Sequence, residues 1–390
     1  MSLLCPMAFF SLTVHPTNVI TSCMLSENKL ASVGEKDGLD NTAFQDLRQN
    51  MFDGKWSKQN CATCMVAEQK GLVSSRMKWG ENARKLMEKF NIDWNLTNNP
   101  IGHLNINLNN VCNFKCRMCG PKYSNAWIPD AKHLKKQDPS IVRDWNDGDA
   151  KQFVDYLKLL ELYGDRMRLQ SVWVTGGEPF IDNQIFVVLH QLKNYCDPAN
   201  IKLNITTNGS KINLDKIKEL YEFKEVVINV SVDATGELFS YMRSAGVFSF
   251  DDLCKNIKAL KEIDMPNMRV QINASHQIYN SLNILDFYKT FTEDIPVSNI
   301  EMRTLSHPLY LDASIMPDNI KKQAIEQAET VLKEYNKHKR TSDDLESVIK
   351  NLQFDNPNKI LLWKKFNKFT NLLDKRRNHF LKNVEPRLAQ

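Results

Sequence analysis

The sequence predicts an α/β fold: a partial barrel of six parallel strands, preceded by a cysteine-rich region and followed by helices. Three observations predict it. Between residues 101 and 310, strand patterns alternate with helical patterns, which is typical of right-handed β–α–β units. This stretch offers six strands where a closed barrel needs eight, so we expect an open barrel. Cysteines gather before the barrel and at its start, and residues 311–390 show only helical periodicity.

The N-terminal hundred residues, which we take as a domain of their own (1–100), begin with an apolar segment. No basic residue precedes this segment and Pro6 interrupts it, so we interpret it as a buried strand and not as a signal peptide. The alternation that follows predicts a hairpin with its turn at His15–Asn18. This hairpin would bring together Cys5 and Cys23, which lie at its two open ends.

The other elements follow from hydrophobic periodicity. The predicted barrel strands are 103–108, 171–175, 202–207, 226–232, 269–275 and 299–303. The predicted helices are 42–51 and 61–90 before the barrel, and 150–163, 183–195, 213–221, 250–263 and 282–291 within it. The helical C-terminal part carries apolar positions spaced for packing on the barrel: Leu361, Leu362, Trp363, Phe366, Phe369, Leu372 and Leu373. We therefore divide the chain into three domains, residues 1–100, 101–310 and 311–390.

Composition and charge exclude several classes of protein. Hydrophobic residues make up 42% and charged residues 25% of the chain, which excludes wholesale disorder. No apolar run is long enough to span a bilayer, so we expect no membrane partner. Lys and Arg number 51 against 46 Asp and Glu, and residues 321–390, with 16 basic and nine acidic side chains, carry the whole excess. Such a tail suits nucleic acid or an acidic partner, but we interpret it as the solvated side of packed helices.

The nine cysteines indicate metal or redox chemistry. Their odd number, their close spacings and the lack of an export signal argue against disulfides and for a reducing, cytoplasmic compartment. They fall into three sets: Cys5, Cys23, Cys61 and Cys64; Cys112, Cys116 and Cys119; and the isolated Cys196 and Cys254. We interpret the isolated pair as small buried hydrophobic residues.

The triplet Cys112, Cys116 and Cys119 directly follows the first barrel strand. Three thiolates at this spacing fit one loop around a cubic iron–sulfur cluster. Three ligands leave one iron open, and a catalytic metal needs an open position. On spacing alone, a three-ligand zinc site or a redox trio remains an alternative.

The triplet resembles the signature of the radical S-adenosylmethionine (radical SAM) superfamily, and the resemblance extends over residues 102–310. Gly176, Gly177 and Glu178 end the second strand, as the glycine-glycine-glutamate motif of the family does. Two glycines let the backbone approach a ligand closely, and Glu178 can accept a hydrogen bond from the cofactor's ammonium group. The resemblance also implies cofactor contacts from polar residues at the ends of the third and fourth strands: Thr206, Asn208, Ser231 and Asp233.

The resemblance implies a 4Fe–4S cluster and S-adenosylmethionine (SAM) as cofactors, and cleavage of SAM to a 5′-deoxyadenosyl radical that abstracts a substrate hydrogen. It also implies a one-electron donor such as flavodoxin or ferredoxin. Met118 stands where the family usually has an aromatic residue against the adenine, and a methionine can still pack on that ring. Arg243 is a candidate partner of the SAM carboxylate or, alternatively, part of a surface salt bridge. No catalytic side chain is assigned.

Cys5, Cys23, Cys61 and Cys64 would make a closed site for zinc or an iron–sulfur cluster, and spacing does not separate these metals. The region resembles the auxiliary-cluster "twitch" domain, a shortened form of the SPASM domain, which implies a second 4Fe–4S cluster. The resemblance includes residues after the last cysteine: Glu68, Gly71, Ser75 and Arg76. Asn18 replaces a glycine usual in the hairpin turn, and asparagine tolerates a positive φ.

Three hypotheses for the function follow. A partial barrel would leave a wide lateral opening that suits a peptide, so modification of a peptide or protein side chain comes first. Radical modification of a small molecule, such as a nucleotide, sugar or amino-alcohol, comes second. A non-catalytic iron–sulfur protein that binds nucleic acid is third, and we expect no nucleic-acid partner. The candidate substrate-binding residues are Asn273, His276, Arg303 and His307.

Overall fold

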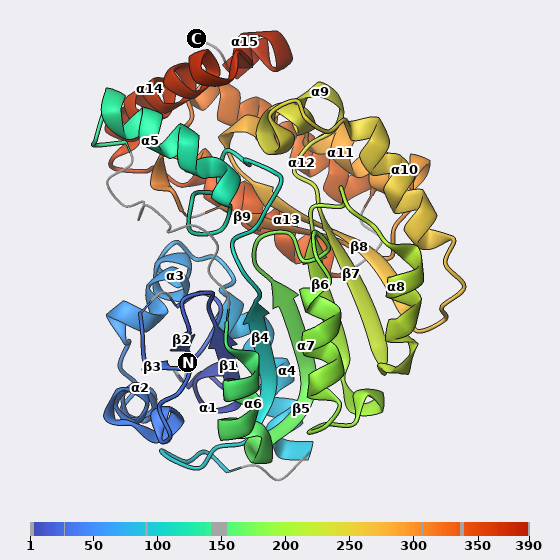
Figure 1. Cartoon of the computed structure of the whole chain (residues 1–390). Helices are drawn as coiled ribbons and strands as arrows, with labels where there is room; N and C mark the ends of the chain where they lie inside the picture. The colour runs from blue at the N-terminus through green and yellow to red at the C-terminus, as the bar shows by residue number, and fades with distance from the viewer. Residues whose placement is uncertain are drawn as a thin grey trace.

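The computed structural model describes residues 4–26, 28–89, 93–141, 154–305, 307–335 and 339–388. It is built on one nine-stranded sheet in the order β3-β2-β1-β4-β5-β6-β7-β8-β9 (Figure 1). Six of these strands pair in parallel in chain order: β4 (Ile101–Asn107), β5 (Met167–Thr175), β6 (Lys202–Thr207), β7 (Glu225–Ser231), β8 (Met268–His276) and β9 (Ile300–Thr304). The predicted α/β fold with a partial six-stranded barrel is confirmed.

Helices expected between these strands are present: α6 (Tyr156–Tyr163), α7 (Gln184–Leu192), α8 (Leu214–Lys218), α10 (Phe250–Lys261) and α11 (Ile284–Lys289). The predicted insert 150–163 is observed as helix only from Tyr156, and its residues 150–153 lie outside the described residues. Two helices were not predicted: α5 (Ile128–Gln137) and the short α9 (Gly236–Phe239).

Along the barrel strands, a buried apolar outer face alternates with a mainly polar inner face, because successive side chains of a strand point to opposite sides. On β8 the buried outer residues are Val270, Ile272 and Ala274, and the half-buried inner ones are Gln271, Asn273 and Ser275. The parallel register places inner residues of neighbouring strands side by side, as with Ser231 and Asn273. The apolar core therefore lies between strands and helices, and the inside of the barrel is lined by polar groups.

The N-terminal hairpin is part of the same sheet. β1 (Ser11–Val14) and β2 (Val19–Thr21) pair antiparallel as predicted, and Asn18 takes a φ of 60° in the turn. β1 also pairs in parallel with β4, so the hairpin extends the barrel sheet. β3 (Ala31–Ser32) pairs with β2 and completes the edge.

Two predictions for the N-terminal region are wrong. The apolar start is not a strand but a buried helical turn, α1 (Met7–Phe10), because Pro6 has helical dihedrals (φ −56°) and proline suits the beginning of a helix. The long helical stretch is two helices, α3 (Lys58–Gln69) and α4 (Ser75–Lys89). Gly71 separates them with a φ of +70°, which a glycine adopts without strain.

Helix α4 packs across the inner face of the barrel. The ring of Trp79 stacks on Trp173 of β5, with centroids 4.8 Å apart, and meets His103 of β4 edge to face. The guanidinium of Arg303, on β9, lies 5.5 Å from the Trp79 ring centroid. Trp79 thereby connects strands from opposite sides of the barrel. The inner face, which we expected to open widely, is partly covered.

Ion pairs hold α3 and α4 in this place. Lys78 pairs with Asp344, and Lys70 pairs with Asp312 at 2.9 Å, through carboxylates that are almost fully buried. Asp344 belongs to the C-terminal helices, which follow the barrel as predicted: α2 lies before it (Thr42–Phe52), and after it come α12 (Asp318–Glu334), α13 (Lys339–Gln353), α14 (Lys359–Arg377) and α15 (Leu381–Val384).

The C-terminal helices bury part of the predicted apolar set. Phe366, Phe369 and Leu373 are fully buried, whereas Leu361 is 68% exposed and does not pack on the barrel as predicted. Leu361 fails because it lies on the solvent side of the first turn of α14. In the described ranges, no helix combines the length and the apolar composition needed to cross a membrane.

We expect Gly102→Ala to lower the free energy of unfolding by about 1–3 kcal/mol, the usual cost of an overpacked core. A Cβ at Gly102 would lie 1.6 Å from the ring of Phe10, so α1 could not keep its place on β4. Urea denaturation measures the change. Gly80→Ala is the matched control, because its Cβ meets only Pro6 at 3.4 Å and alanine favours a helix interior. Equal destabilisation by both changes would contradict the packing of α1 on β4.

Candidate functional site

The cysteine triplet lies in the loop that follows β4. Cys116 is buried, and Cys112 and Cys119 are half-buried. Burial and the neighbouring Cys116 thiol raise the pKa of Cys112 to about 12, and burial with the other two thiols raises that of Cys119. The three sulfur atoms are thus close enough to act on one another. Thiols in such surroundings give up their protons only to a bound metal, which suits ligands of an iron–sulfur cluster.

The glycine-glycine-glutamate turn packs directly on this loop. Gly176 and Gly177 have positive φ values of 87° and 54°. A Cβ on Gly177 would lie 2.2 Å from the carbonyl oxygen of Val111, and the N–H of Glu178 donates to the same oxygen at 2.8 Å. We expected the glycines to admit a ligand. In the structure they admit the backbone of the cysteine loop, which no side chain at these positions would allow.

Glu178 is buried and fully engaged. Its carboxylate accepts hydrogen bonds from the Thr207 hydroxyl and the Asn208 N–H, both at 2.6 Å, and from the Phe180 N–H at 3.2 Å. Burial raises the pKa of Glu178 to about 7, against these hydrogen bonds, which favour the ionised form. The sequence motif singled out Thr206 and Asn208 here and missed Thr207, because only the side to which each strand residue points distinguishes the two threonines.

The predicted strand-end residues surround the loop. The amide Nδ2 of Asn208 donates to Asn113 at 2.9 Å and lies 3.9 Å from the sulfur of Cys112. Thr206 faces the inside of the barrel, where its hydroxyl accepts from the indole N–H of Trp173 at 2.8 Å. The structure therefore brings the ends of β5 and β6 together beside the cysteines.

Asp233 and Arg243 form a buried ion pair at 2.5 Å, with side chains 1% and 11% exposed. The surface salt bridge considered for Arg243 is therefore wrong, because the helical turn after β7 carries this side chain inward. The Asp233 carboxylate also accepts from the N–H of Ser275 at 2.7 Å. Burial raises the pKa of Cys116, and the positive charge of Arg243 opposes this rise, so Arg243 lies near the loop. Its Nε is buried without a partner among the described residues.

Ser231 and Met118, the remaining cofactor candidates, are half-buried. Ser231 ends β7 on the inner face, opposite Asn273 in the register, and Met118 packs at the edge of the core. Neither position has a described hydrogen bond that shows a role.

The four candidate substrate residues do not share one surface. Asn273 lies on the inner face of β8, and Arg303 lies on that of β9, where it pairs with Glu301. His276 is fully buried on the outer face and hydrogen-bonds to Ser281 at 3.1 Å. Its selection was wrong, because three residues separate it from Asn273 and an odd separation reverses the side of a strand. His307 is exposed in the loop after β9.

The loop has a further support that the sequence did not indicate. Arg117 is fully buried, donates to Asp374 of α14 at 2.5 Å and lies 3.5 Å from the ring centroid of Tyr241. The indole N–H of Trp127 donates to the carbonyl oxygen of Cys116 at 2.7 Å. No local pattern marks such contacts, because Arg117 and Asp374 are 257 residues apart in the chain.

Cys5, Cys23, Cys61 and Cys64 line one pocket, together with apolar and aromatic side chains and Arg76. Burial, and then the neighbouring thiols Cys23 and Cys64, raise the pKa of Cys61 to about 12. These four thiols, brought together from the hairpin, α1 and α3, fit a closed metal site. In contrast, Cys196 and Cys254 are half-buried and isolated.

Polar residues that follow the last of these cysteines brace the pocket. Glu68 pairs with Arg76 through two bonds of 3.0 and 2.7 Å and accepts from the hydroxyl of Ser74 at 2.6 Å. Ser74 takes the place that we had given to Ser75. Trp79 lines this pocket and also stacks inside the barrel, so the pocket and the inner face share a side chain.

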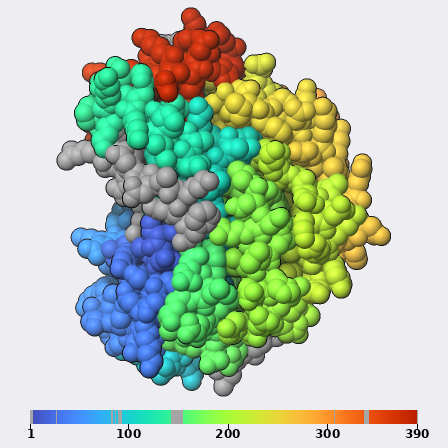
Figure 2. All heavy atoms as spheres, viewed as in Figure 1, coloured from blue at the N-terminus to red at the C-terminus, as the bar shows by residue number. Residues whose placement is uncertain are grey.

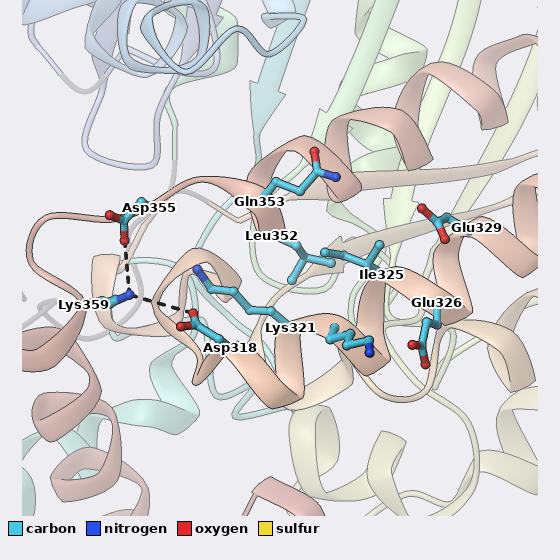
Figure 3. A pocket seen from close by; sticks show the side chains of 10 residues that line it. Asp318, Lys321, Ile325, Glu326, Glu329, Leu352, Gln353, Asp355 and Lys359 are labelled. Atoms are coloured by element: carbon cyan, nitrogen blue, oxygen red, sulfur yellow. Dashed lines mark ion pairs between the residues drawn. The ribbon is translucent and has the colours of Figure 1, made fainter.

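In the described ranges, no three His, Cys, Asp or Glu side chains are arranged around a single metal ion. A four-iron cluster distributes its ligands over different irons, so both cysteine sets remain compatible with clusters. A separate hollow beside α12 (Figure 3) contains none of the predicted site residues. There Lys359 pairs with Asp355 at 3.2 Å and Asp318 at 3.8 Å, and Lys321 donates to the carbonyl oxygen of Phe354.

Comparison with known families identifies the class. Residues 106–276, from β4 to the end of β8, match the family model of the Radical SAM superfamily. The chain therefore carries a radical SAM enzyme domain, and the cysteine loop and the strand ends described above lie within it. Such a domain implies a 4Fe–4S cluster and SAM. This result favours an enzyme over a non-catalytic iron–sulfur protein.

Curated relatives are more distant. GTP 3′,8-cyclase from Pasteurella multocida is 23% identical over 200 residues, which cover 50% of this chain and 51% of that protein. The probable GTP 3′,8-cyclase of Pyrococcus horikoshii is 25% identical over 169 residues, 43% of this chain and 45% of that protein. The chain thus spans about half the length of these relatives.

Solved structures also match part of the chain. The enzyme anSMEcpe with bound AdoMet covers 60% of this chain and 61% of its own, with a TM-score of 0.44 and 15% identity. Streptococcus suis SuiB bound to its precursor peptide SuiA covers 84% of this chain and 70% of its own, with a TM-score of 0.37 and 14% identity.

Proposed function

We propose that this chain cleaves SAM reductively on a 4Fe–4S cluster held by Cys112, Cys116 and Cys119, and directs the resulting radical to a hydrogen of a compact, polar substrate of the nucleotide kind. The observation that carries the proposal is the arrangement of three thiols against the glycine-glycine-glutamate turn. When bound, the cluster supplies the electron that breaks the sulfur–C5′ bond of SAM. The chain's own residues bind SAM, orient the substrate and exclude water.

Glu178 and Asn208 are placed to receive the methionyl end of SAM. Glu178 has a pKa raised to about 7, so an arriving ammonium group would stabilise its ionised form. The buried Arg243 keeps an unpartnered Nε near Cys116, and a carboxylate is the group that a guanidinium binds best. Met118 supplies an apolar surface for the adenine.

The barrel interior supports a compact substrate over a peptide, which we had placed first. That ranking depended on a wide opening, and α4 partly covers the inner face through Trp79, Trp173 and Arg303. The covered face combines a stacked indole pair with a guanidinium, and these groups suit a flat ring and a negative charge. The curated relatives are named for a reaction of GTP, a nucleotide, which supports the same class.

For the N-terminal pocket we propose a second 4Fe–4S cluster on Cys5, Cys23, Cys61 and Cys64. Four thiols with no other metal-binding side chain suit a fully ligated cluster, although zinc uses the same donors. Such a cluster would leave no free iron for a substrate. Its role would be to hold the hairpin, α3 and α4 together and so to place Trp79 in the barrel.

The barrel site is tested by anaerobic reconstitution with reductant and SAM. We expect formation of 5′-deoxyadenosine by the native protein, and none by a variant in which Cys112, Cys116 and Cys119 are all replaced by alanine, because the cluster has lost its ligands. Liquid chromatography with mass detection measures the product. Cys254→Ala is the control and should retain activity. Continued 5′-deoxyadenosine formation by the triple variant would refute the assignment.

The N-terminal site is tested by Cys61→Ala combined with Cys64→Ala. Iron should fall from about eight to about four atoms per chain, as expected for the loss of one of two four-iron clusters. Stability of the N-terminal region should also fall, because metal-binding energy there is folding energy. SAM cleavage should partly survive while turnover of substrate is lost. Stoichiometric zinc, with iron for only one cluster in native protein prepared without oxygen, would contradict this site.

The substrate class is tested by transfer of deuterium into 5′-deoxyadenosine. We expect transfer from perdeuterated nucleotides and none from deuterated peptides, because the covered inner face favours a compact polar molecule. Mass spectrometry of the 5′-deoxyadenosine reads the transfer. Deuterium that arrives only from a peptide would restore the peptide hypothesis and reject the nucleotide one.

A further inference from the structure

Cys116 lies between two buried pairs of arginine and aspartate. One is the Arg243–Asp233 pair of the barrel. The other joins Arg377, in the last turn of α14, to Asp130 of α5, with Nε and Oδ2 3.0 Å apart and both side chains no more than 3% exposed. Helices α5 and α14 lie side by side at one end of the molecule (Figure 2). The second pair has no place in the binding of SAM described above.

The guanidinium of Arg377 is fixed over the backbone of the cluster loop. It lies 4.6 Å from the ring centroid of Trp127, and the indole N–H of Trp127 donates to the carbonyl oxygen of Cys116 at 2.7 Å. Nη1 and Nη2 of Arg377 are buried and have no hydrogen-bond partner among the described residues. Burial and the nearby Arg117 lower the pKa of Arg377, while Asp130 and then Cys116 oppose this change. The charge of Cys116 therefore acts on Arg377.

The surroundings of Arg377 carry a net positive charge. Three cations share the Asp130 carboxylate: Lys115 at 3.4 Å, Arg376 at 3.3 Å and Arg377 at 3.0 Å. One carboxylate cannot neutralise three cations. Lys115 and Arg376 are 30% and 40% exposed, so water screens them, whereas Arg377 is 2% exposed. Most of the unscreened positive field at the loop therefore comes from Arg377.

We propose that Arg377 is a positioning residue that, through Trp127 and the Cys116 loop, stabilises the reduced state of the barrel cluster and so raises its reduction potential. The inference rests on the proposed function, because it assumes a cluster on the three cysteines. Reduction by one electron, supplied by a flavodoxin- or ferredoxin-type donor, makes the cluster more negative. A buried positive charge favours that state, and local charge and hydrogen-bond donors are known determinants of cluster potentials. Nη1 and Nη2 are the donors that this chain can offer.

The experiment is a redox titration of the reconstituted protein, followed by the EPR signal that changes when SAM is added, since that change marks the barrel cluster. For Arg377→Gln we expect reduction to become about tenfold less favourable, which is about 59 mV for one electron. Arg376→Gln is the matched control. It removes the same charge from the same helix and the same carboxylate, but from an exposed position, and should change the equilibrium less than twofold.

Two more variants separate a field effect from a loss of structure. Arg377→Lys keeps the charge and should recover most of the native potential. Asp130→Asn removes the opposing charge and should make reduction more favourable, the opposite direction to Arg377→Gln. Shifts in the same direction for Asp130→Asn and Arg377→Gln, or no shift in either, would overturn the inference. If Arg377→Gln fails to load iron, the Lys and Asn variants decide. Native protein without a SAM-sensitive signal would instead reject the proposed function.

Discussion

The structure depends on the way in which the loop of residues 110–120 is held. This loop has no regular secondary structure, so its backbone groups need partners elsewhere. The N–H of Glu178 donates to Val111, and the indole of Trp127 donates to Cys116, while Arg117 reaches Asp374 in α14. The barrel, α5 and the C-terminal helices thus each provide one support. Three thiols keep a common orientation because all three supports are rigid elements.

The polar inside of the barrel is the second constraint. Buried amides and hydroxyls cost free energy unless they are paired, and here they pair with one another: Asn105 with Thr13, Trp173 with Thr206, and Gln271 with Asn229. The first of these pairs joins the N-terminal hairpin to β4. Because Trp79 belongs both to the four-cysteine pocket and to the inner face, events at that pocket reach the barrel through a single side chain.

Sequence reasoning succeeded where the determining pattern was local. The barrel strands were predicted to within a few residues, because an apolar outer face leaves its period in the sequence itself. It failed where a residue's side of a strand or a single backbone angle mattered. His276 was placed on the wrong face of β8, and Gly71 was not recognised as the end of α3. The apolar start of the chain was taken for a strand, because a four-residue helical turn is too short to show a period.

By itself the sequence determined the alternation that makes a parallel barrel, the three thiols at the end of its first strand and the glycine pair that follows the second. These depend on covalent spacing and on neighbours in the chain. Only the tertiary structure decided that Gly177 approaches Val111, that α4 crosses the inner face, and that Arg377 lies over Trp127. Those contacts join segments separated by many residues. They arise from packing and from the need to pair buried charges, and neither leaves a period in the sequence.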